Sequence, residues 1–199
     1  MRGIQGAERA VGVPALPVSP ERTSKGNVMD PKLFDPQLII EIFRRNVTEH
    51  YYDMNGRVSR AEFWLFVLAS FVVTLLASIV GAIVGFSTLL GSLVSLALLP
   101  PLAGLGARRL QDTGKPGSTV WIAIIPMGIS RLCSALLGLA GPFMIIGLLF
   151  LWPIVGLIGL AALIAAIYVG YLCAQPGTAG ANEYGPEPPK PVAPQTKAA

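Results

Sequence analysis

The stretch Phe63–Ala107, FWLFVLASFVVTLLASIVGAIVGFSTLLGSLVSLALLPPLAGLGA, carries no charged side chain over its 45 residues. A transmembrane helix needs about 20 apolar residues to cross the hydrocarbon core of a bilayer. The stretch is therefore long enough for two spans. We predict spans near residues 63–85 and 88–107 with a turn at Gly85–Ser87, and we expect Pro100-Pro101 to kink the second span near its end.

A second apolar block runs from Thr119 to Cys173 and is interrupted only by Arg131. Its length predicts two more spans, near residues 119–140 and 149–173, although a boundary at Trp152-Pro153 would allow a third. Charged residues are correspondingly rare in this part of the chain. Those between Phe63 and Glu183 are Arg108, Arg109, Asp112, Lys115 and Arg131.

The composition of the whole chain agrees with this pattern. Hydrophobic residues make up 53% of the 199 residues and charged residues only 13%, whereas a soluble domain has about 25% charged residues. We predict an all-α integral membrane protein with about four transmembrane helices within residues 63–174, an amphipathic N-terminal helix and disordered termini. The basic residues flank apolar segments and form no run of their own, so nucleic acid is not expected as a partner.

The segments outside the spans are more polar. Residues 1–32 are expected to be disordered or to be an untranslated extension, with Met29 as the natural start. Residues 33–62 are predicted to contain an amphipathic helix with Asp35 as its N-cap, followed by a capped entry to the first span at Ser59. The Pro-rich residues 175–199 are predicted to be a solvated tail.

The helix within residues 33–62 has one apolar side, which is formed by Leu38, Ile39, Ile42, Phe43 and Val47. A helix of this kind can lie along a membrane surface with its arginines near lipid phosphates. It can equally pack its apolar side on other helices. The sequence leaves both alternatives open.

The orientation follows from the distribution of basic residues. They gather before the first span and between the second and third spans, at Arg44, Arg45, Arg57, Arg60, Arg108, Arg109 and Lys115. With four spans these two regions lie on the same side, which the positive-inside rule makes cytoplasmic. We therefore expect a multi-pass protein of a bacterial inner membrane with both termini in the cytoplasm and anionic lipids as neighbours.

Three short segments combine glycine, proline and charged residues in a specific order. They are NGRVSRAEFW at Asn55–Trp64, RRLQDTGKPG at Arg108–Gly117 and PGTAGANEYGPEP at Pro176–Pro188. Together they resemble the bacterial family catalogued as domain of unknown function 805, the YhaH-like inner-membrane proteins, over roughly residues 47–188. The resemblance implies a membrane protein and assigns no chemistry. This chain has Gln111 where the family usually has histidine.

Two hypotheses account for the charged residues of these segments. Asp112 lies three and four residues after Arg109 and Arg108, so it can pair with either in a helical turn. Asp112 and Glu62 are then structural ion-pair candidates that hold the cytoplasmic ends of the spans together. In the alternative, the arginines bind the phosphate of a lipid or ligand through their planar guanidinium groups, and the candidates are Arg57, Arg60, Arg108 and Arg109.

Arg131 is the one charge predicted to lie well inside a span. A charged residue at this depth is a functional-site candidate, because burying it in hydrocarbon costs about 2.5–3.5 kcal/mol on insertion scales. It can also extend its side chain toward the membrane surface, or its span can be broken or re-entrant. These possibilities remain open.

Enzymatic function is not expected, because the sequence contains no HExxH or GxSxG motif and no pair of aspartates within the spans. No metal site or cofactor is expected either, since His50 is the single histidine and Cys133 and Cys173 are far apart. The favoured function is a non-enzymatic membrane scaffold or accessory protein that contacts anionic lipid. It could form a homo-oligomer or bind another membrane protein. The alternative is a small oligomeric transporter or channel that uses Arg131.

Overall fold

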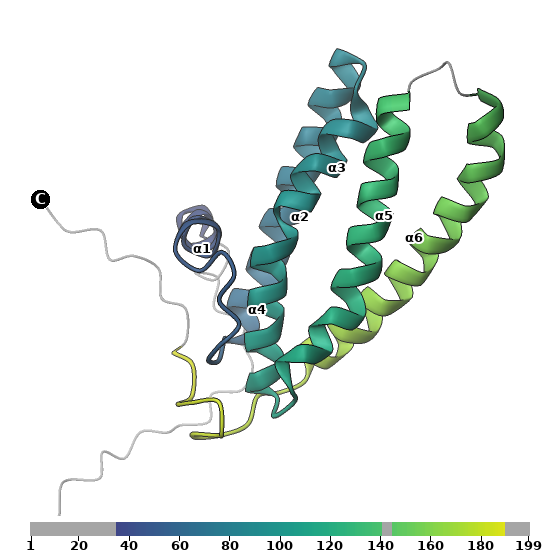
Figure 1. Ribbon diagram of the computed structural model, residues 1–199. Coiled ribbons are helices and arrows are strands. Elements are labelled where there is room, and N and C mark those ends of the chain that lie inside the picture. Colours follow the sequence, from purple (N-terminus) through teal and green to yellow (C-terminus); the bar gives the residue numbers. More distant parts are fainter. Residues whose placement is uncertain (1–34, 141–144, 190–199) are drawn as a thin grey trace, which may run out of the picture. The chain divides into compact units, whose positions relative to one another are not determined.

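The computed structural model of the protein describes residues 35–140 and 145–189, so the prediction for residues 1–32 lies outside the described part. The elements are α1 (Pro36–Thr48), α2 (Arg60–Val84), α3 (Ser87–Ala97), α4 (Leu99–Asp112), the short 3-10 helix η2 (Gly117–Val120), α5 (Trp121–Ala140) and α6 (Ile145–Ala174). Figure 1 shows the long helices running side by side, with α5 and α6 diverging toward the loop that joins them. The predicted all-α class is confirmed, and the described residues contain no β-strand.

The residues predicted to cap or end the helices do so in the structure. The Asp35 carboxylate accepts a hydrogen bond of 3.0 Å from the backbone N–H of Gln37, and the Ser59 hydroxyl accepts one of 3.2 Å from the backbone N–H of Glu62. Helix α2 ends at Gly85, whose φ of 86° is the left-handed conformation that glycine adopts without strain. These three residues fix where α1 and α2 begin and where the first turn lies.

Three helical segments are long and apolar enough to cross a membrane: Arg60–Val84, Gly117–Leu139 and Pro153–Ala174. Helices α3 and α4 provide a fourth crossing if they form one span bent by 44° at their junction. Helix α6 continues through Pro153, so a boundary at Trp152-Pro153 is not present.

The second span differs from the prediction in the position of its irregularity. Instead of a kink near its end, the chain breaks at Leu98, and the Pro100-Pro101 pair lies in the first turn of α4. A proline in a first turn removes no intrahelical hydrogen bond from its own helix. Pro101 nevertheless cannot donate to the carbonyl of Ala97, which instead accepts a 2.8 Å hydrogen bond from the Tyr51 hydroxyl.

Helices α2 and α3–α4 run antiparallel in one register across the break. A Cβ atom added at Gly91 of α3 would overlap the hydroxyl of Ser78, and one added at Gly106 of α4 would lie 3.9 Å from the Phe63 ring. A step of 15 residues forward, from Gly91 to Gly106, corresponds to a step of 15 residues back along α2, from Ser78 to Phe63. Each residue of α3 or α4 can therefore be assigned a height along α2.

Helix α5 keeps a similar register with α3 and α4. A Cβ atom added at Gly138 would lie 3.1 Å from the backbone nitrogen of Leu89, and one added at Gly128 would lie 3.5 Å from the Leu99 side chain. Glycine at these positions allows the helices to approach closely, as small residues do in membrane proteins.

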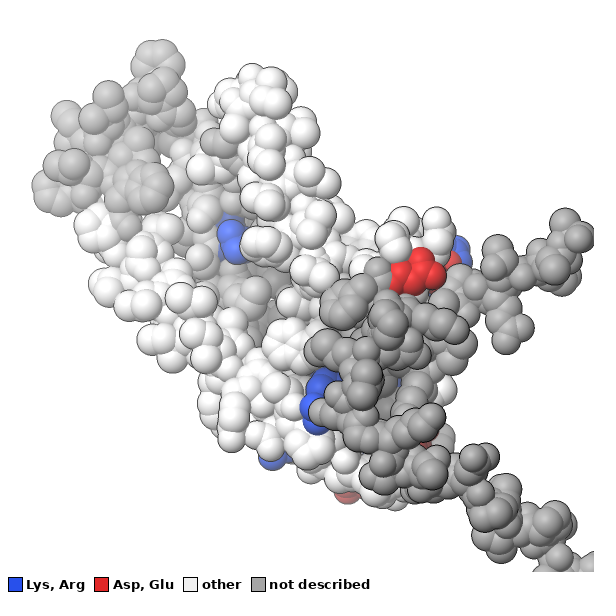
Figure 2. Space-filling model, turned by 180° about the vertical axis from the view of Figure 1, so that it is seen from behind, with Lys and Arg blue, Asp and Glu red and all other residues white. Residues whose placement is uncertain are grey.

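Exposed apolar side chains define the part of the helices that faces lipid. On α2 they run from Leu68 to Val84, and α5 and α6 carry similar series. Figure 2 shows the resulting broad apolar surface on one face, broken by a basic patch. By contrast, residues 103–112 of α4 are all buried by the protein. The last residues of the predicted span 88–107 thus lie beside the buried start of α2, within the bent candidate span that ends at Asp112.

Helix α1 packs its apolar side against the other helices. Leu38 and Ile42 are buried, and the rings of Phe43 and Phe66 stack with their centroids 5.6 Å apart. The following loop lies against α4, where a Cβ atom at Gly104 would approach the carbonyl oxygen of Asp53 to 2.7 Å. Of the two alternatives for this helix, packing on other helices accounts for its apolar residues.

Candidate functional site

The carboxylate of Asp112, at the end of α4, is the centre of a buried polar cluster. It accepts hydrogen bonds from the Arg57 guanidinium, at 2.9 Å from Nε, and from the Arg109 guanidinium. The side chains of Arg57 and Arg109 are each 1% exposed and that of Asp112 is 5% exposed. Opposite charges this well enclosed are screened little by solvent, so the three groups depend on one another.

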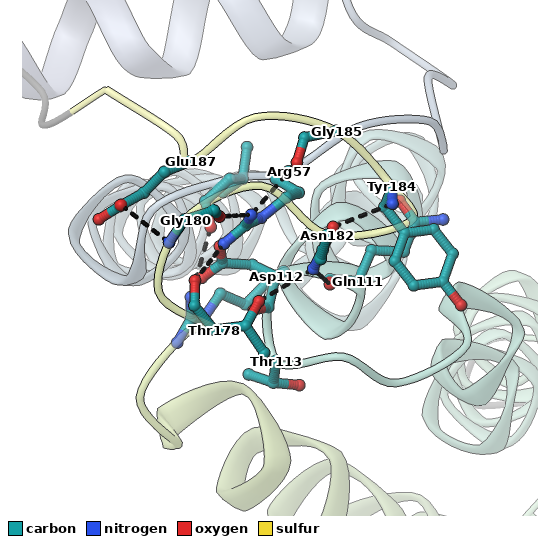
Figure 3. A network of polar contacts seen from close by, with 12 residues as sticks. Arg57, Gln111, Asp112, Thr113, Thr178, Gly180, Asn182, Tyr184, Gly185 and Glu187 are labelled. Carbon is teal, nitrogen blue, oxygen red and sulfur yellow. Dashed lines mark hydrogen bonds and ion pairs between the residues drawn. The ribbon is translucent and has the colours of Figure 1, made fainter.

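The remaining N–H groups of the two arginines donate to backbone carbonyls near the C-terminal end of the chain. Arg57 donates to the carbonyls of Thr178 and Gly180, both at 2.6 Å. Arg109 donates to the carbonyl of Cys173 at 2.8 Å and to that of Gln175. Figure 3 shows how the segment after α6 wraps around the Arg57 side chain. The three sequence motifs thus meet at one cluster.

The segment after α6 also forms its own contacts with the end of α4. The backbone N–H of Thr178 donates to the carbonyl of Asp112 at 2.8 Å, and the Asn182 amide donates to the carbonyl of Gln111 at 3.0 Å. Asn182 and Gly185 close a tight turn through mutual backbone hydrogen bonds of 3.0 Å. The segment is thus held against α4 by specific contacts, which composition did not predict, while residues 176–181 are exposed to solvent. Residues 190–199 lie outside the described part.

A second polar cluster connects α1, α2 and α4. Glu62 accepts a hydrogen bond from Arg45, and the Asn46 amide nitrogen lies 3.5 Å from the Glu62 carboxylate. The amide oxygen of Asn46 accepts a 2.9 Å hydrogen bond from Arg108. Asn46 is completely buried and Arg108 is 7% exposed. Arg108 therefore belongs to this cluster and not to the one around Asp112.

The four arginines considered for an anion site do not converge on one point. Arg57 and Arg109 are occupied by Asp112 and by carbonyls, and Arg108 lies in the second cluster. Arg60 is exposed. It lines a pocket of about 240 Å³ together with Ser59, Asp112, Thr178 and Glu187, among others. Arg57 and Arg109 line the same pocket, so three of the four arginines meet there beside the Asp112 and Glu187 carboxylates, while Arg108 does not. The phosphate site made by the four arginines stays a prediction.

Arg131 lies away from both clusters. It is exposed on the surface of α5, and no Asp or Glu carboxylate within residues 35–140 and 145–189 lies within ion-pair distance of it. The same described residues contain no group of three potential metal ligands. Cys133 and Cys173 are not joined by a disulfide.

Sequence reasoning missed several residues of the clusters. Asn46 was not distinguished, although a polar residue between Ile42 and Val47 on the apolar side of a helix could have drawn attention to it. The hydrogen bonds of the Tyr51 hydroxyl and of the carbonyls after α6 could not be predicted from sequence, because they join segments far apart in the chain. Asp112 was expected to pair with Arg109 or Arg108, and its bond to Arg57 could not be inferred from helical spacing.

Comparison with known proteins supports the classification by motif. The chain is 27% identical over 144 residues to the Inner membrane protein YhaI of Escherichia coli strain K12, which covers 72% of this chain and 92% of the relative. It is 24% identical over 147 residues to the Inner membrane protein YhaH of the same strain, with 71% and 92% covered. No solved structure matches the chain.

The family model described as "Protein of unknown function (DUF805)" matches residues 51–186, a range that includes both Arg57 and Asp112 and nearly the whole segment after α6. The apolar helices and the relatives together identify a multi-pass helical membrane protein. The chain therefore belongs to the DUF805 family of membrane proteins.

Proposed function

We propose that this protein is a non-enzymatic membrane scaffold or accessory protein of the bacterial inner membrane, with both termini in the cytoplasm. The observation that carries the proposal is the arrangement around Asp112. Its carboxylate is shared between Arg57 and Arg109, and the other donors of these arginines go to the carbonyls of the segment after α6.

This arrangement supports a structural role for the polar residues of the three motifs. An acid–base or nucleophilic group needs an atom that can reach a substrate. The guanidinium groups of Arg57 and Arg109 are instead enclosed, and the Asp112 carboxylate is held by both. Residues in this situation hold the ends of α2, α4 and α6 together, which is what a stable membrane scaffold requires.

The cytoplasmic location of the termini is supported by the basic residues at this end of the helices. Arg60 begins α2, and Lys115 lies in the loop between α4 and η2. Short loops rich in Lys and Arg stay on the cytoplasmic side of a bacterial membrane. The other two turns, at 85–86 and 141–144, carry no charged residue.

A basic face toward anionic lipid is the second part of the proposal. The side chains of Arg44 and Arg45 are 57% and 41% exposed, and Arg60 is exposed as well. Trp64, 41% exposed, lies one turn after Arg60, and tryptophan favours the headgroup region of a bilayer. Arginines at this height can contact lipid phosphates without leaving water entirely.

The proposal is tested by isolating the full-length chain from membranes with a mild detergent after chemical cross-linking. We expect wild-type protein to be recovered in assemblies, either with itself or with another membrane protein, and Asp112→Asn to lose them. Anionic lipid recovered with the protein should fall several-fold in Arg60→Gln. Assemblies that persist in Asp112→Asn, with unchanged lipid in Arg60→Gln, would contradict the proposal.

A double substitution that removes both members of an ion pair gives a sharper version of this test, and the partner of Asp112 must be chosen from the structure. Arg108 donates to Asn46, so exchanging Arg108 and Asp112 would not recreate a native pair. Arg57 is the appropriate partner, because it approaches Asp112 from a different segment. Arg57→Gln combined with Asp112→Asn leaves one enclosed arginine, Arg109, without its counter-ion instead of two, so it should be less harmful than Asp112→Asn alone.

The alternative function, a small oligomeric transporter or channel, would depend on Arg131. Arg131 is exposed on α5, which favours this function over a role for Arg131 in packing the helices together. A transporter should lose flux in proteoliposomes when Arg131 is replaced by leucine. A scaffold should retain its assemblies in the same variant.

A further inference from the structure

Arg131 requires a partner that the described residues do not supply. It is exposed on α5 among apolar neighbours such as Ile129 and Leu132, which are 48% and 52% exposed. No carboxylate within residues 35–140 and 145–189 lies within ion-pair distance of it. A guanidinium group stays charged in a protein, so it needs an acceptor or water wherever it is held.

The register of the helices gives the depth of Arg131 in the membrane. Gly128 of α5 faces Leu99, and Gly91 of α3 faces Ser78 of α2. Continuing both registers brings Arg131 to the height of Val73. With a rise of 1.5 Å per residue, this height is about 7.5 Å inward from Leu68, where the exposed apolar series begins, and about 16.5 Å from Val84, where it ends.

The direction of the side chain favours the nearer boundary. In a helix the Cα–Cβ bonds tilt toward the N-terminus, and α5 begins at Trp121, at the end of the molecule where Arg60 and Asp112 lie. A long arginine side chain can extend from this depth and bring its guanidinium group close to the headgroup layer. The boundary near Val84 is farther away, and the Cα–Cβ bond of Arg131 tilts away from it.

A second copy of the chain cannot neutralise Arg131 with a carboxylate inside the membrane. The sequence has no Asp or Glu between Glu62 and Asp112, and none between Asp112 and Glu183. Every acidic residue of a neighbouring copy would therefore lie outside the apolar band. The anion that is abundant at the inner edge of the headgroup layer is the phosphate of a phospholipid.

We propose that Arg131 binds the phosphate of a phospholipid in the leaflet on the Asp112 side, and that it draws this lipid toward α5. The planar guanidinium group can donate two parallel hydrogen bonds to phosphate oxygens. The acyl chains of the same lipid would cover the exposed apolar residues of α5 and α6, such as Ile129 and Leu160. The proposal is independent of the scaffold function, because it does not involve either polar cluster.

Native mass spectrometry of the full-length protein tests the proposal, with phosphatidylglycerol as the probe and diacylglycerol, which has the same acyl chains and no phosphate, as the comparison. Wild-type protein should bind one phosphatidylglycerol at least tenfold more tightly than Arg131→Leu does, and should show no such preference for diacylglycerol. Arg131→Lys should lie between them, since lysine keeps the charge without the planar fork. Arg60→Leu should keep the strong site, which separates it from the basic face described above.

Three results would overturn the proposal. Equal binding by wild type and a folded Arg131→Leu would show that Arg131 holds no lipid. Equal binding of diacylglycerol would show that the phosphate is not recognised. Displacement of the lipid by millimolar inorganic phosphate would assign the site to a soluble anion. Circular dichroism and gel filtration of Arg131→Leu and Arg131→Lys establish that both variants are folded before binding is compared.

Discussion

The guanidinium group of Arg57 lies 2.8 Å from the carboxylate of Asp112, although 55 residues separate them in the chain. The contact joins the loop before α2 to the last residue of α4. Because Arg109 shares the same carboxylate and donates to the carbonyls after α6, one acidic side chain organises three distant segments. All three lie within the region that the family model matches.

Replacing Asp112 with asparagine should destabilise the protein strongly. The substitution leaves the charges of Arg57 and Arg109 enclosed without a counter-ion, and breaking a buried ion pair in this way costs about 3–5 kcal/mol. The free energy of unfolding in detergent, from denaturant titration, measures the effect. Asp53→Asn is the matched control: its side chain is 39% exposed beside His50, so its loss should cost about 0–1 kcal/mol. Similar values for both variants would contradict a buried cluster.

Replacing Gly177 with alanine should release the segment after α6. A Cβ atom at this position would overlap the Asp112 carboxylate, which is already fixed by two arginines. We expect limited proteolysis between residues 176 and 188 to become several-fold faster. Gly156→Ala, where a Cβ atom meets nothing within 4 Å, should leave the rate unchanged. Unchanged proteolysis in Gly177→Ala would mean that the segment is not held there.

Removing the Tyr51 hydroxyl should weaken the junction of α3 and α4. In Tyr51→Phe the carbonyl of Ala97 loses its 2.8 Å hydrogen bond, and Pro101 cannot replace it. The expected loss is about 0.5–1.5 kcal/mol in thermal or chemical unfolding. Tyr52→Phe serves as the control, since Tyr52 is 57% exposed and makes no side-chain hydrogen bond with the described residues. A larger effect at Tyr52 than at Tyr51 would argue against this account of the break.

Enlarging Gly91 should separate α2 from α3. A Cβ atom at Gly91 would overlap the hydroxyl of Ser78, so Gly91→Ala should cost about 1–3 kcal/mol through overpacking. Adding Ser78→Ala should restore part of the loss, because it removes the atom that the new methyl group meets. Gly159→Ala, with its nearest contact at 3.7 Å, should be tolerated. Additive effects of Gly91→Ala and Ser78→Ala would show that the two residues do not touch.

The sequence predicts local features of this fold well, because they depend on neighbouring residues. Asp35 and Ser59 cap their helices as expected, and Gly85 ends the first span. The capping box at Ser59 is only half formed, however. The Glu62 side chain does not accept a hydrogen bond from the backbone N–H of Ser59, because it binds the charged Arg45 side chain from another helix instead.

Features that depend on tertiary contact were predicted less well. The pair Pro100-Pro101 indicates that the helix is irregular in this region. The break lies before the pair, at Leu98, because prolines in the first turn of a new helix cost it no hydrogen bond. The segment after Gln175 has the composition of a solvated tail. It is ordered because Arg57 and Arg109 offer their donors to its carbonyls, which composition does not reveal.

Cysteine accessibility in intact cells tests the central claim, that three motifs meet on the cytoplasmic face of a four-span protein. Single cysteines are introduced at Ser87, Ser118 and Ala181 in a chain without Cys133 and Cys173. The account predicts that a membrane-impermeant maleimide labels position 87 in intact cells, and labels positions 118 and 181 only after permeabilisation. Labelling of 118 and 181 from opposite sides would contradict it, because Asp112 and Thr178 could not then be in contact.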